Sequence, residues 1–418
     1  MTTDNKLNSI VQSCRIILKM AQPGPLQKSD TLYYQMLSKY YTKLLKAHET
    51  GGFIAAHTVF FPSEILYAMD IVPMHTEMTT WLAALFTGEQ ESFLSAGAEL
   101  GLAAEICSPH RGLAGAFKRG YLPRPDTILW SNLICDNTAK SGELIMKLNN
   151  CPGFFLDHPF QHSKKEVSYL VNELKSMVKF LEGLSGHKMD WDKLSEVVAR
   201  TNQQLALTRE IGELRKLVPS PFPTQGFLKL VSADYLFPGQ PEAIAYLQQL
   251  RDDLKNIILN NKNTPNREKY RIMTLFLPPI YLMSYLDKVY LENGAVSVVE
   301  PMFNTWVESE FDPSKPLGSV AEKSYLIPES RIMYGPLTDD IVKAVVKSAE
   351  DYKINGALFW AFLGCRHACA TIKIFKDALN EAGIPMQAVD CDIVDPTINP
   401  QEEIGEKLER FFELMEGL

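Results

Sequence analysis

The stretch that decides the fold is INGALFWAFLGCRHACATIKIFKDALNEAGIPMQAVDCDIVDP, residues 354–396. Its apolar run, Ala357 to Leu363, is too short to cross a membrane and predicts a strand buried on both faces of a parallel sheet. Apolar residues then recur at spacings of three and four, which predicts a helix that ends at Gly383-Ile384-Pro385. The apolar segment Met386 to Val389 predicts the next strand. The stretch is therefore expected to form a strand–helix–strand unit of an open α/β sheet.

This unit is rich in side chains that bind metals. Ligands of open α/β sheets bind outside the carboxyl ends of the strands, so the unit directs Cys365, His367, Cys369 and Cys391 toward one crevice. A zinc ion bound by Cys365, His367 and Cys369 is one alternative, but a helix points position i+2 away from positions i and i+4. No cysteine pair has a CxxC spacing, which argues against zinc-ribbon and thioredoxin-like sites.

Other cysteines stand at similar places earlier in the chain. Cys107 precedes a predicted helix start, where free backbone N–H groups stabilise a thiolate. Cys135 follows the predicted strand Thr127 to Ile134, whereas Cys151 precedes its strand and is expected at the opposite edge of the sheet. Thiolates at Cys107, Cys135 and Cys365 suit an iron–sulfur cluster. A cluster held by only three cysteines leaves one iron open to another ligand.

The pattern of apolar residues divides the chain into four predicted parts. Residues 1–50 are expected to be helical, and residues 51–162 to form a first α/β lobe. Residues 163–267 carry long apolar stripes and are expected to form a helical connecting segment. Residues 268–418 are expected to form a second α/β lobe with a C-terminal helix. The predicted fold is α/β, with two Rossmann- or flavodoxin-like lobes that contain parallel sheets.

Composition excludes several classes of protein. The chain has 418 residues, 46% of them hydrophobic and 22% charged, and a net charge of -8, which suits a globular protein and argues against nucleic-acid binding. No stretch approaches the roughly 18 apolar residues that a membrane-spanning helix needs, and the first residues lack a secretory signal pattern. We therefore expect a soluble cytoplasmic protein without membrane contact. In that compartment its seven cysteines are expected to bind metal or react rather than to form disulfides.

The sequence resembles one known family, the subunits of 2-hydroxyacyl-CoA dehydratases and benzoyl-CoA reductases, which includes related double-cubane reductases. The resemblance covers most of the chain from about residue 50 onward, in the order of the family. It is carried by the segments FPSEILYAMDIVPM, EICSPHRGLAG, RPDTILWSNLICDN, FFLDHP, NGALFWAFLGCR, AGIPMQAVDCDIVDP and QEEIGEKLERFFELME.

The resemblance implies a cofactor, partners and a reaction. The cofactor is a [4Fe-4S] cluster between the lobes, and the matching positions assign Cys107, Cys135 and Cys365 as its ligands. The partners are an ATP-hydrolysing iron–sulfur activator protein, which supplies a low-potential electron, and a second subunit in a homodimer or heterodimer. The reaction is the radical dehydration or reduction of a CoA thioester, such as an (R)-2-hydroxyacyl-CoA.

Four further residues in the matching segments are candidates for proton transfer or substrate orientation: Ser63, Glu64, His110 and Arg111. Ser63 and Glu64 follow the predicted strand Phe53 to Phe61, and capping of the next helix is the favoured alternative for both. Hydrogen bonding within a loop is the alternative for His110 and Arg111.

The sequence leaves two other functions open. Adding Cys151, Cys369 and Cys391 to the three proposed ligands gives six thiols, the number that a double-cubane [8Fe-9S] cluster needs, as in the related reductases of small molecules. Against this, Cys151 is expected on the wrong edge of its sheet, and Cys369 suits a helix core. The second alternative is a non-catalytic subunit whose cluster relays electrons or supports a heterodimer.

Overall fold

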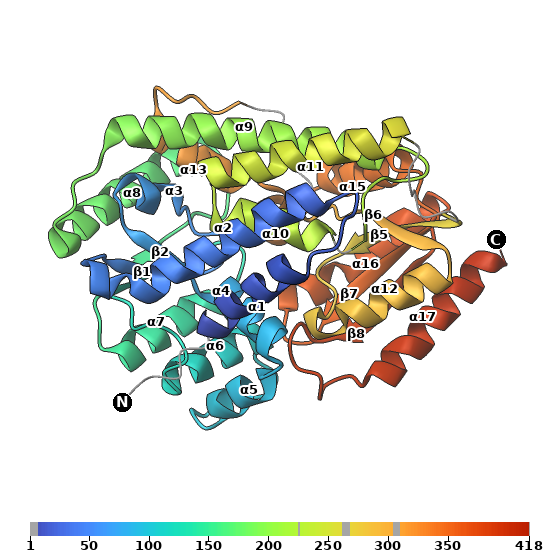
Figure 1. Cartoon of the computed structure of the whole chain (residues 1–418), viewed down its shortest axis with the longest axis horizontal. Helices are drawn as coiled ribbons and strands as arrows, with labels where there is room; N and C mark the ends of the chain where they lie inside the picture. The colour runs from blue at the N-terminus through green and yellow to red at the C-terminus, as the bar shows by residue number, and fades with distance from the viewer. Residues whose placement is uncertain (1–6, 225, 261–267, 304–309, 418) are drawn as a thin grey trace.

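Two parallel sheets organise the molecule. The computed structural model describes residues 7–224, 226–260, 268–303 and 310–417. Within these ranges lie two four-stranded sheets, with the strand orders β2-β1-β3-β4 and β6-β5-β7-β8. Figure 1 shows the first sheet toward the left and the second toward the right, each with helices packed around it. The predicted fold class, two Rossmann-like α/β lobes with N-terminal helices, is confirmed.

The first sheet consists of short strands, of which the first three are buried at every residue. Its strands are β1 (Ile54–His57), β2 (Val72–His75), β3 (Thr127–Ser131) and β4 (Gly153–Leu156). All pairs are parallel, and the register places His57 beside His75 at the carboxyl ends of β1 and β2. The predicted strand Phe53 to Phe61 is therefore shorter than expected. Phe60 has a φ of 58°, which lies outside the range of a strand.

The second sheet contains the stretch on which the prediction depended. Its strands are β5 (Tyr270–Leu275), β6 (Ala295–Val299), β7 (Gly356–Phe362) and β8 (Met386–Cys391). Strand β7 is buried at all of its residues and lies between β5 and β8, as its continuous apolar run predicts. Helix α16 (Arg366–Glu381) connects β7 to β8. The predicted strand–helix–strand unit is confirmed.

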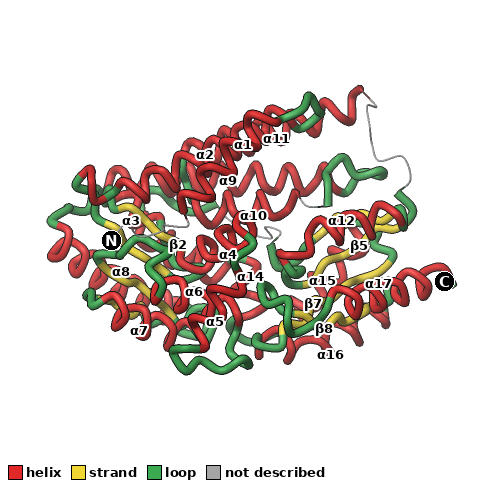
Figure 2. Tube along the Cα trace, turned by 60° about the horizontal axis from the view of Figure 1, so that its bottom comes forward, coloured by secondary structure: helices red, strands yellow, loops and turns green. Residues whose placement is uncertain are grey.

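Long helices extend from one lobe toward the other. They are α1 (Leu7–Met20), α2 (Gln27–Lys46), α8 (Lys164–Ser185), α9 (Trp191–Arg215), α10 (Gly226–Leu236) and α11 (Pro241–Asn260). Asp190 accepts a hydrogen bond from the backbone N–H of Lys193 and so caps the start of α9. Figures 1 and 2 both show α9 and α11 along one side of the molecule, with α10 between the two sheets.

Shorter helices complete both lobes. They are α3 (Glu64–Ala68), α4 (Thr76–Thr87), α5 (Gln90–Ala98), α6 (Ser108–Lys118), α7 (Thr138–Asn149), α12 (Met283–Glu292), α13 (Pro316–Leu326), α14 (Pro328–Met333), α15 (Asp339–Asp351) and α17 (Gln401–Glu416). Single 3-10 turns occur at His48–Thr50 and Ile280–Leu282.

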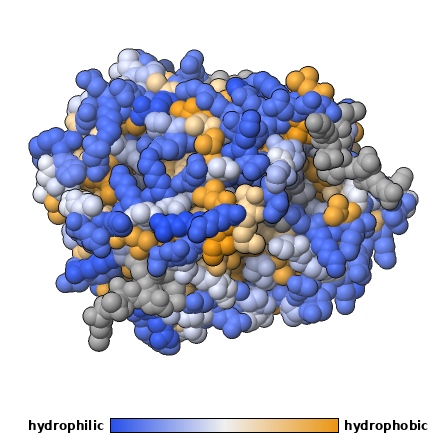
Figure 3. Space-filling view, viewed as in Figure 1, coloured by the Kyte–Doolittle hydropathy of each residue, from blue (hydrophilic) through white to orange (hydrophobic). Residues whose placement is uncertain are grey.

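The hydrophobic core is continuous between the lobes. One cluster of buried side chains includes Ala56 of β1 and Leu358 of β7, so it joins the two sheets. A second cluster packs Leu129 of β3 against helix α8. Figure 3 shows that polar residues cover much of one outer face, with scattered apolar residues among them. Among the described residues, no helix combines the length and apolar character needed to span a bilayer.

Candidate functional site

Three cysteines from both lobes line one cavity of about 90 Å³, which we call the cysteine cavity. Cys107 occupies the position before the first residue of α6, and Cys365 occupies the same position before α16. Cys135 lies in the connection from β3 to α7. The backbone N–H of Ala368 donates to the sulfur of Cys365 at 3.5 Å. Each sulfur thus lies near the start of a helix, where the peptide dipoles favour a thiolate.

The two lobes meet at the backbone beside these cysteines. A Cβ atom added to Gly364 would lie 2.6 Å from the Cα atom of Cys107, closer than any ordinary contact. The loop that carries Cys365 therefore packs directly on the loop that carries Cys107. This close approach requires glycine at position 364, because any side chain there would push the lobes apart.

The cysteine sulfurs are buried and affect one another's ionisation. Burial, followed by the nearby thiols of Cys135 and Cys365, raises the pKa of Cys107 well above its usual value. Burial and the thiol of Cys365 raise the pKa of Cys135 to about 12. Burial likewise raises the pKa of Cys365. Without a cation these thiols would stay protonated at neutral pH, whereas a bound metal deprotonates a coordinating thiol outright.

Strained backbone gathers around this cavity. Phe60, Ile134 and Phe276 have φ values of 58°, 69° and 63°, and all three line the cavity. Each residue follows the carboxyl end of a strand, namely β1, β3 and β5. Left-handed φ values are costly for β-branched and aromatic residues, and such residues cluster at functional sites.

Three residues that line the cavity carry buried polar atoms without hydrogen bonds among the described residues. His75 Nε2, Glu77 Oε1 and Trp81 Nε1 belong to residues that line it, and none has a hydrogen-bond partner within the described ranges. Burial raises the pKa of Glu77 to about 7. An unsatisfied buried polar atom destabilises the fold unless something binds to it. These atoms therefore indicate that the cavity accommodates a bound group.

His110 lies beside one of the cysteines. Its Nε2 atom is 3.4 Å from the sulfur of Cys135, and its Nδ1 atom is 2.9 Å from the hydroxyl of Ser141. Burial lowers the pKa of His110 to about 4, so the ring is neutral at pH 7. The Ser141 contact fixes the orientation of the ring toward the sulfur.

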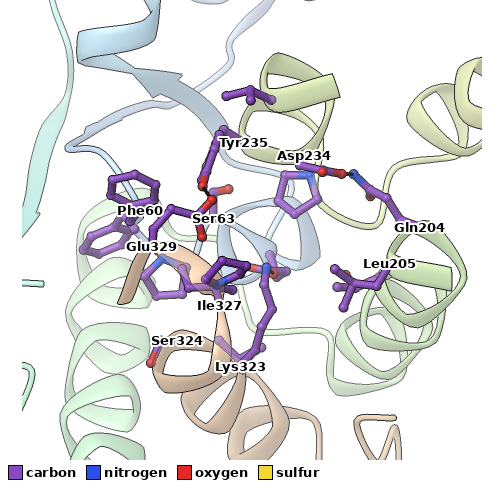
Figure 4. A pocket seen from close by; sticks show the side chains of 18 of the residues that line it. Phe60, Ser63, Gln204, Leu205, Asp234, Tyr235, Lys323, Ser324, Ile327 and Glu329 are labelled. Carbon is purple, nitrogen blue, oxygen red and sulfur yellow. Dashed lines mark hydrogen bonds and ion pairs between the residues drawn. The ribbon is translucent and has the colours of Figure 1, made fainter. Parts of the chain in front are cut away.

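A second cavity adjoins the first, and Figure 4 shows it from close by. We call it the carboxyl cavity, because Glu64, Asp234 and Glu329 line it together with Ser63 and Lys323. Lys323 donates to Glu64, which is buried, and the hydroxyl of Tyr235 donates to Glu329. Phe60, Val231, Tyr235 and Phe303 line both cavities and form the wall between them.

The alternative explanation of Ser63 and Glu64 by the start of a helix holds for their positions, because Ser63 precedes α3 and Glu64 lies in its first turn. Their side-chain contacts differ from those of helix caps. Ser63 stands before α3, but its side chain makes no capping hydrogen bond within the described structure. The Glu64 carboxylate is 2% exposed and bonds to Lys323 from α13 instead of to its own helix. Tertiary contact between α3 and α13 overrides the local preference.

Arg111 bonds across the contact between the lobes. Its guanidinium is buried and pairs with Asp395 of the second lobe. Near it, Ser108 donates to Asp392, and this contact also joins the two lobes. Arg111 is not among the described residues that line either cavity. Loop and interlobe bonding therefore accounts for its contacts.

The three further cysteines considered as cluster ligands are placed elsewhere. Cys151 precedes β4 at the amino ends of the strands, Cys391 ends β8 in the interior, and the sulfur of Cys369 donates to the carbonyl of Phe362. None of the three is among the described residues that line the cysteine cavity. The described part of the chain also contains no group of three or more His, Cys, Asp or Glu side chains close enough to hold a single metal ion. This includes the zinc site considered for Cys365, His367 and Cys369.

Several residues at the two cavities were not predicted. Glu77 lies in the first turn of α4, Asp234 and Tyr235 lie near the end of α10, and Lys323 and Glu329 lie on α13 and α14. None belongs to a motif that marks a functional site. The one available signal was the charge of Lys323 and Glu329 beside apolar segments, and it is too common to be specific.

Comparison with known proteins places this geometry in context. A family model described as "2-hydroxyglutaryl-CoA dehydratase, D-component" matches residues 58–415. The chain is similar to the (R)-2-hydroxyisocaproyl-CoA dehydratase alpha subunit of Clostridioides difficile, with 23% identity over 91% of this chain and 94% of the relative. It is equally similar to a benzoyl-CoA reductase subunit of Thauera aromatica, with 23% identity over 91% of this chain and 93% of the relative.

A shorter match is also to a dehydratase subunit. The lactoyl-CoA dehydratase alpha subunit of Anaerotignum propionicum is 22% identical over 71% of this chain and 70% of the relative. The relatives are dehydratases and a reductase, and each is named as a subunit. The family model extends from the end of β1 into the last helix, α17. The resemblance predicted from the sequence is therefore confirmed, and the chain belongs to the 2-hydroxyglutaryl-CoA dehydratase D-component family.

Proposed function

We propose that this chain is an iron–sulfur enzyme subunit in which Cys107, Cys135 and Cys365 hold a [4Fe-4S] cluster. The observation that carries the proposal is the convergence of three thiols from two lobes on one cavity, each near the start of a helix. Soft thiolate ligands suit iron. A bound cation would offset the burial and the neighbouring thiols that raise the pKa values of these cysteines. A second observation that suits a bound group is that three residues lining the cavity carry buried polar atoms with no hydrogen-bond partner in the described part of the chain.

When bound, such a cluster supplies one-electron chemistry and an iron that polarises a substrate oxygen. The chain's own residues provide the setting. Phe276, Met302 and Phe362 give the cavity apolar walls that exclude water. His110 orients toward the sulfur of Cys135 and holds that ligand in place.

The substrate that we propose is a CoA thioester, which undergoes dehydration of its 2-hydroxyacyl group or reduction. Support comes from the names of the relatives, which include dehydratases of 2-hydroxyacyl-CoA thioesters and a benzoyl-CoA reductase. The relatives are named as subunits, which supports a partner subunit, and we propose that this partner is a second copy or a related chain. We further propose an ATP-hydrolysing iron–sulfur activator as electron donor and a cytoplasmic location.

Ser63 and Glu64 are proposed to act on the substrate from the carboxyl cavity. Both line that cavity next to the wall that it shares with the cysteine cavity. The buried Glu64–Lys323 pair provides a proton acceptor beside a proton donor. We assign Arg111 to the contact between the lobes, because it pairs with Asp395.

Metal analysis after anaerobic purification of the full chain tests the cluster proposal. We expect about four iron and four sulfide per chain, and about eight iron would instead favour the double cubane. Cys107→Ala, Cys135→Ala and Cys365→Ala should each lose most of the iron. Cys151→Ala is the matched control, because Cys151 lies at the opposite edge of its sheet, and it should keep the iron. Full iron content in Cys135→Ala would contradict the ligand assignment.

Turnover distinguishes an enzyme from an electron relay. The purified chain should be combined with an activator, ATP and, where one is found, its partner subunit. Consumption of a CoA thioester that depends on Cys365 would support the enzyme. The relay would be favoured by two results together. The chain would contain the cluster and pass electrons on, and Glu64→Gln would leave turnover unchanged.

A further inference from the structure

We propose that the carboxyl cavity binds the acyl group of the CoA thioester and selects against an acyl group that carries a second carboxylate. The inference rests on the proposed function and adds to it a class of substrate: neutral short acyl chains. Three features of the cavity support it: its position, its size and the charges that line it.

The position of the cavity suits an acyl group. It shares Phe60, Val231, Tyr235 and Phe303 with the cysteine cavity. The rings of Phe60 and Tyr235, two of these shared residues, are in edge contact, with centroids 4.8 Å apart. A thioester carbonyl near the cysteines would therefore leave its acyl chain a few bonds from the carboxyl cavity.

The size and walls of the cavity suit a short chain. Its volume is about 80 Å³, which is small compared with a whole CoA thioester. Phe60, Leu205, Val320 and Ile327 provide apolar surface for an aliphatic or aromatic acyl group. Figure 4 shows Phe60, Leu205 and Ile327 around the space into which the polar side chains project.

The charges in the cavity disfavour an anion. Three carboxyl groups face it, from α3 (Glu64), α10 (Asp234) and α14 (Glu329), whereas α13 contributes a single cation, Lys323. This lysine is already paired with Glu64. The nearby imidazole of His57 adds no positive charge, because burial lowers its pKa to about 4.

The protonation states of Asp234 and Glu329 set the net charge of the carboxyl cavity near pH 7. Burial raises the pKa of Asp234 to about 6, although Gln204 donates to its carboxylate at 2.7 Å. Burial raises the pKa of Glu329 to about 8, although the hydroxyl of Tyr235 bonds to it. At pH 7 most Asp234 is ionised and most Glu329 is neutral. A second acyl carboxylate would then meet uncompensated negative charge in a site of low dielectric, which costs affinity.

Calorimetric titration of the full chain with two CoA thioesters tests the inference. One carries the neutral 2-hydroxyisocaproyl group and the other the anionic 2-hydroxyglutaryl group, at pH 7 and with the protein kept anaerobic. We expect the neutral thioester to bind at least about tenfold more tightly. Equal affinities, or tighter binding of the anionic thioester, would overturn the inference.

Two measurements show whether the carboxyl cavity causes the difference. Asp234→Asn removes one negative charge without changing size, and the affinity ratio should fall by about threefold or more. Glu322→Gln is the matched control, since it removes a carboxylate next to Lys323 that instead pairs with His162, and it should leave the ratio unchanged. Raising the pH from 7 to 9 ionises Glu329 in the wild-type protein and should increase the ratio. An unchanged ratio in Asp234→Asn and at pH 9 would refute the assignment of the cavity.

The same titration separates this inference from the proposed function. If neither thioester nor free CoA binds to chain that contains its iron, the proposed substrate class fails, and the inference fails with it. If both thioesters bind equally, the proposed function stands and the charge selection alone is rejected.

Discussion

The guanidinium of Arg111 and the carboxylate of Asp395 form a buried ion pair between residues that lie 284 positions apart in the chain. Arg111 belongs to the helix that begins beside Cys107, and Asp395 follows the last strand of the second lobe. The adjacent Ser108–Asp392 hydrogen bond spans the same interface. These contacts fix the lobe that carries Cys107 against the lobe that carries Cys365.

Removal of the Asp395 charge should therefore loosen the lobes. Asp395→Asn leaves the Arg111 guanidinium buried without a counter-charge, and loss of one partner of a buried pair costs about 3 kcal/mol. The midpoint of urea unfolding measures the change. Asp390→Asn is the control, because Asp390 pairs with Lys407 at the surface, where such pairs contribute about 0.5 kcal/mol. Equal effects of the two substitutions would show that the buried pair is not important for stability.

Gly364 provides a second test of the interface. Gly364→Ala would place a methyl group against the backbone of Cys107, so the two cysteine loops must separate. We expect the purified variant to contain less than about half of the wild-type iron, because displaced ligands bind metal poorly. Gly183→Ala is the control, since a Cβ atom there meets no heavy atom within 4 Å. Normal iron content in Gly364→Ala would mean that the contact does not position the ligands.

The sequence predicted the sheets because their signals are local. The apolar run of β7 and the helical spacing of α16 lie in one continuous stretch, and both describe burial that the structure confirms. The strand predicted over Phe53 to Phe61 was too long, because Phe60 adopts a left-handed conformation that its side chain disfavours. Only the packing around the cysteine cavity enforces such a conformation, and an apolar pattern does not report it.

The sequence predicted only the part of the candidate site that local signals mark. Cys107, Cys135 and Cys365 lie at strand ends or helix starts, which are recognisable from the sequence, and topology brings such places together. Lys323 and Glu329 reach the carboxyl cavity from helices that lie far beyond Glu64 in the chain. Lys323, which bonds to Glu64, is separated from it by 259 positions. A partner at that distance requires tertiary structure, so the sequence suggested helix capping instead. The division into four parts stays a prediction, and residues 261–267, near its last boundary, lie outside the described residues.

His110 should stabilise the metal site through its contact with Cys135. In His110→Ala the sulfur loses its neighbour, and loss of such a supporting contact lowers metal affinity by about 10-fold or more. Release of iron to a chelator, followed by absorbance, should therefore be faster, and the electron paramagnetic resonance spectrum should change. His162→Ala is the control, because His162 is exposed and pairs with Glu322. Identical release rates in the two variants would contradict a positioning role for His110.

The buried Glu329 should make stability depend on pH. Its pKa rises from 4.5 in the unfolded chain to about 8 in the fold, because burial penalises the charged form. Between these values the folded state binds more protons than the unfolded state, so the free energy of unfolding falls as pH rises through this range. The contribution of this group is fully present below pH 4.5 and lost above about pH 8.

Glu329→Gln isolates this contribution, because the amide keeps the size of the side chain and does not ionise. Between pH 5 and pH 8 the wild-type protein should lose stability relative to the variant, with a slope of up to about 1.4 kcal/mol per pH unit for one proton. Urea unfolding at several pH values in this range measures the difference between the two proteins. Glu322→Gln alters an exposed carboxylate, so its free energy of unfolding should change with pH in the same way as that of the wild type. A Glu329→Gln curve that also runs parallel would mean that Glu329 is ionised in the fold at neutral pH, and the carboxyl cavity would then be more negative than its buried contacts indicate.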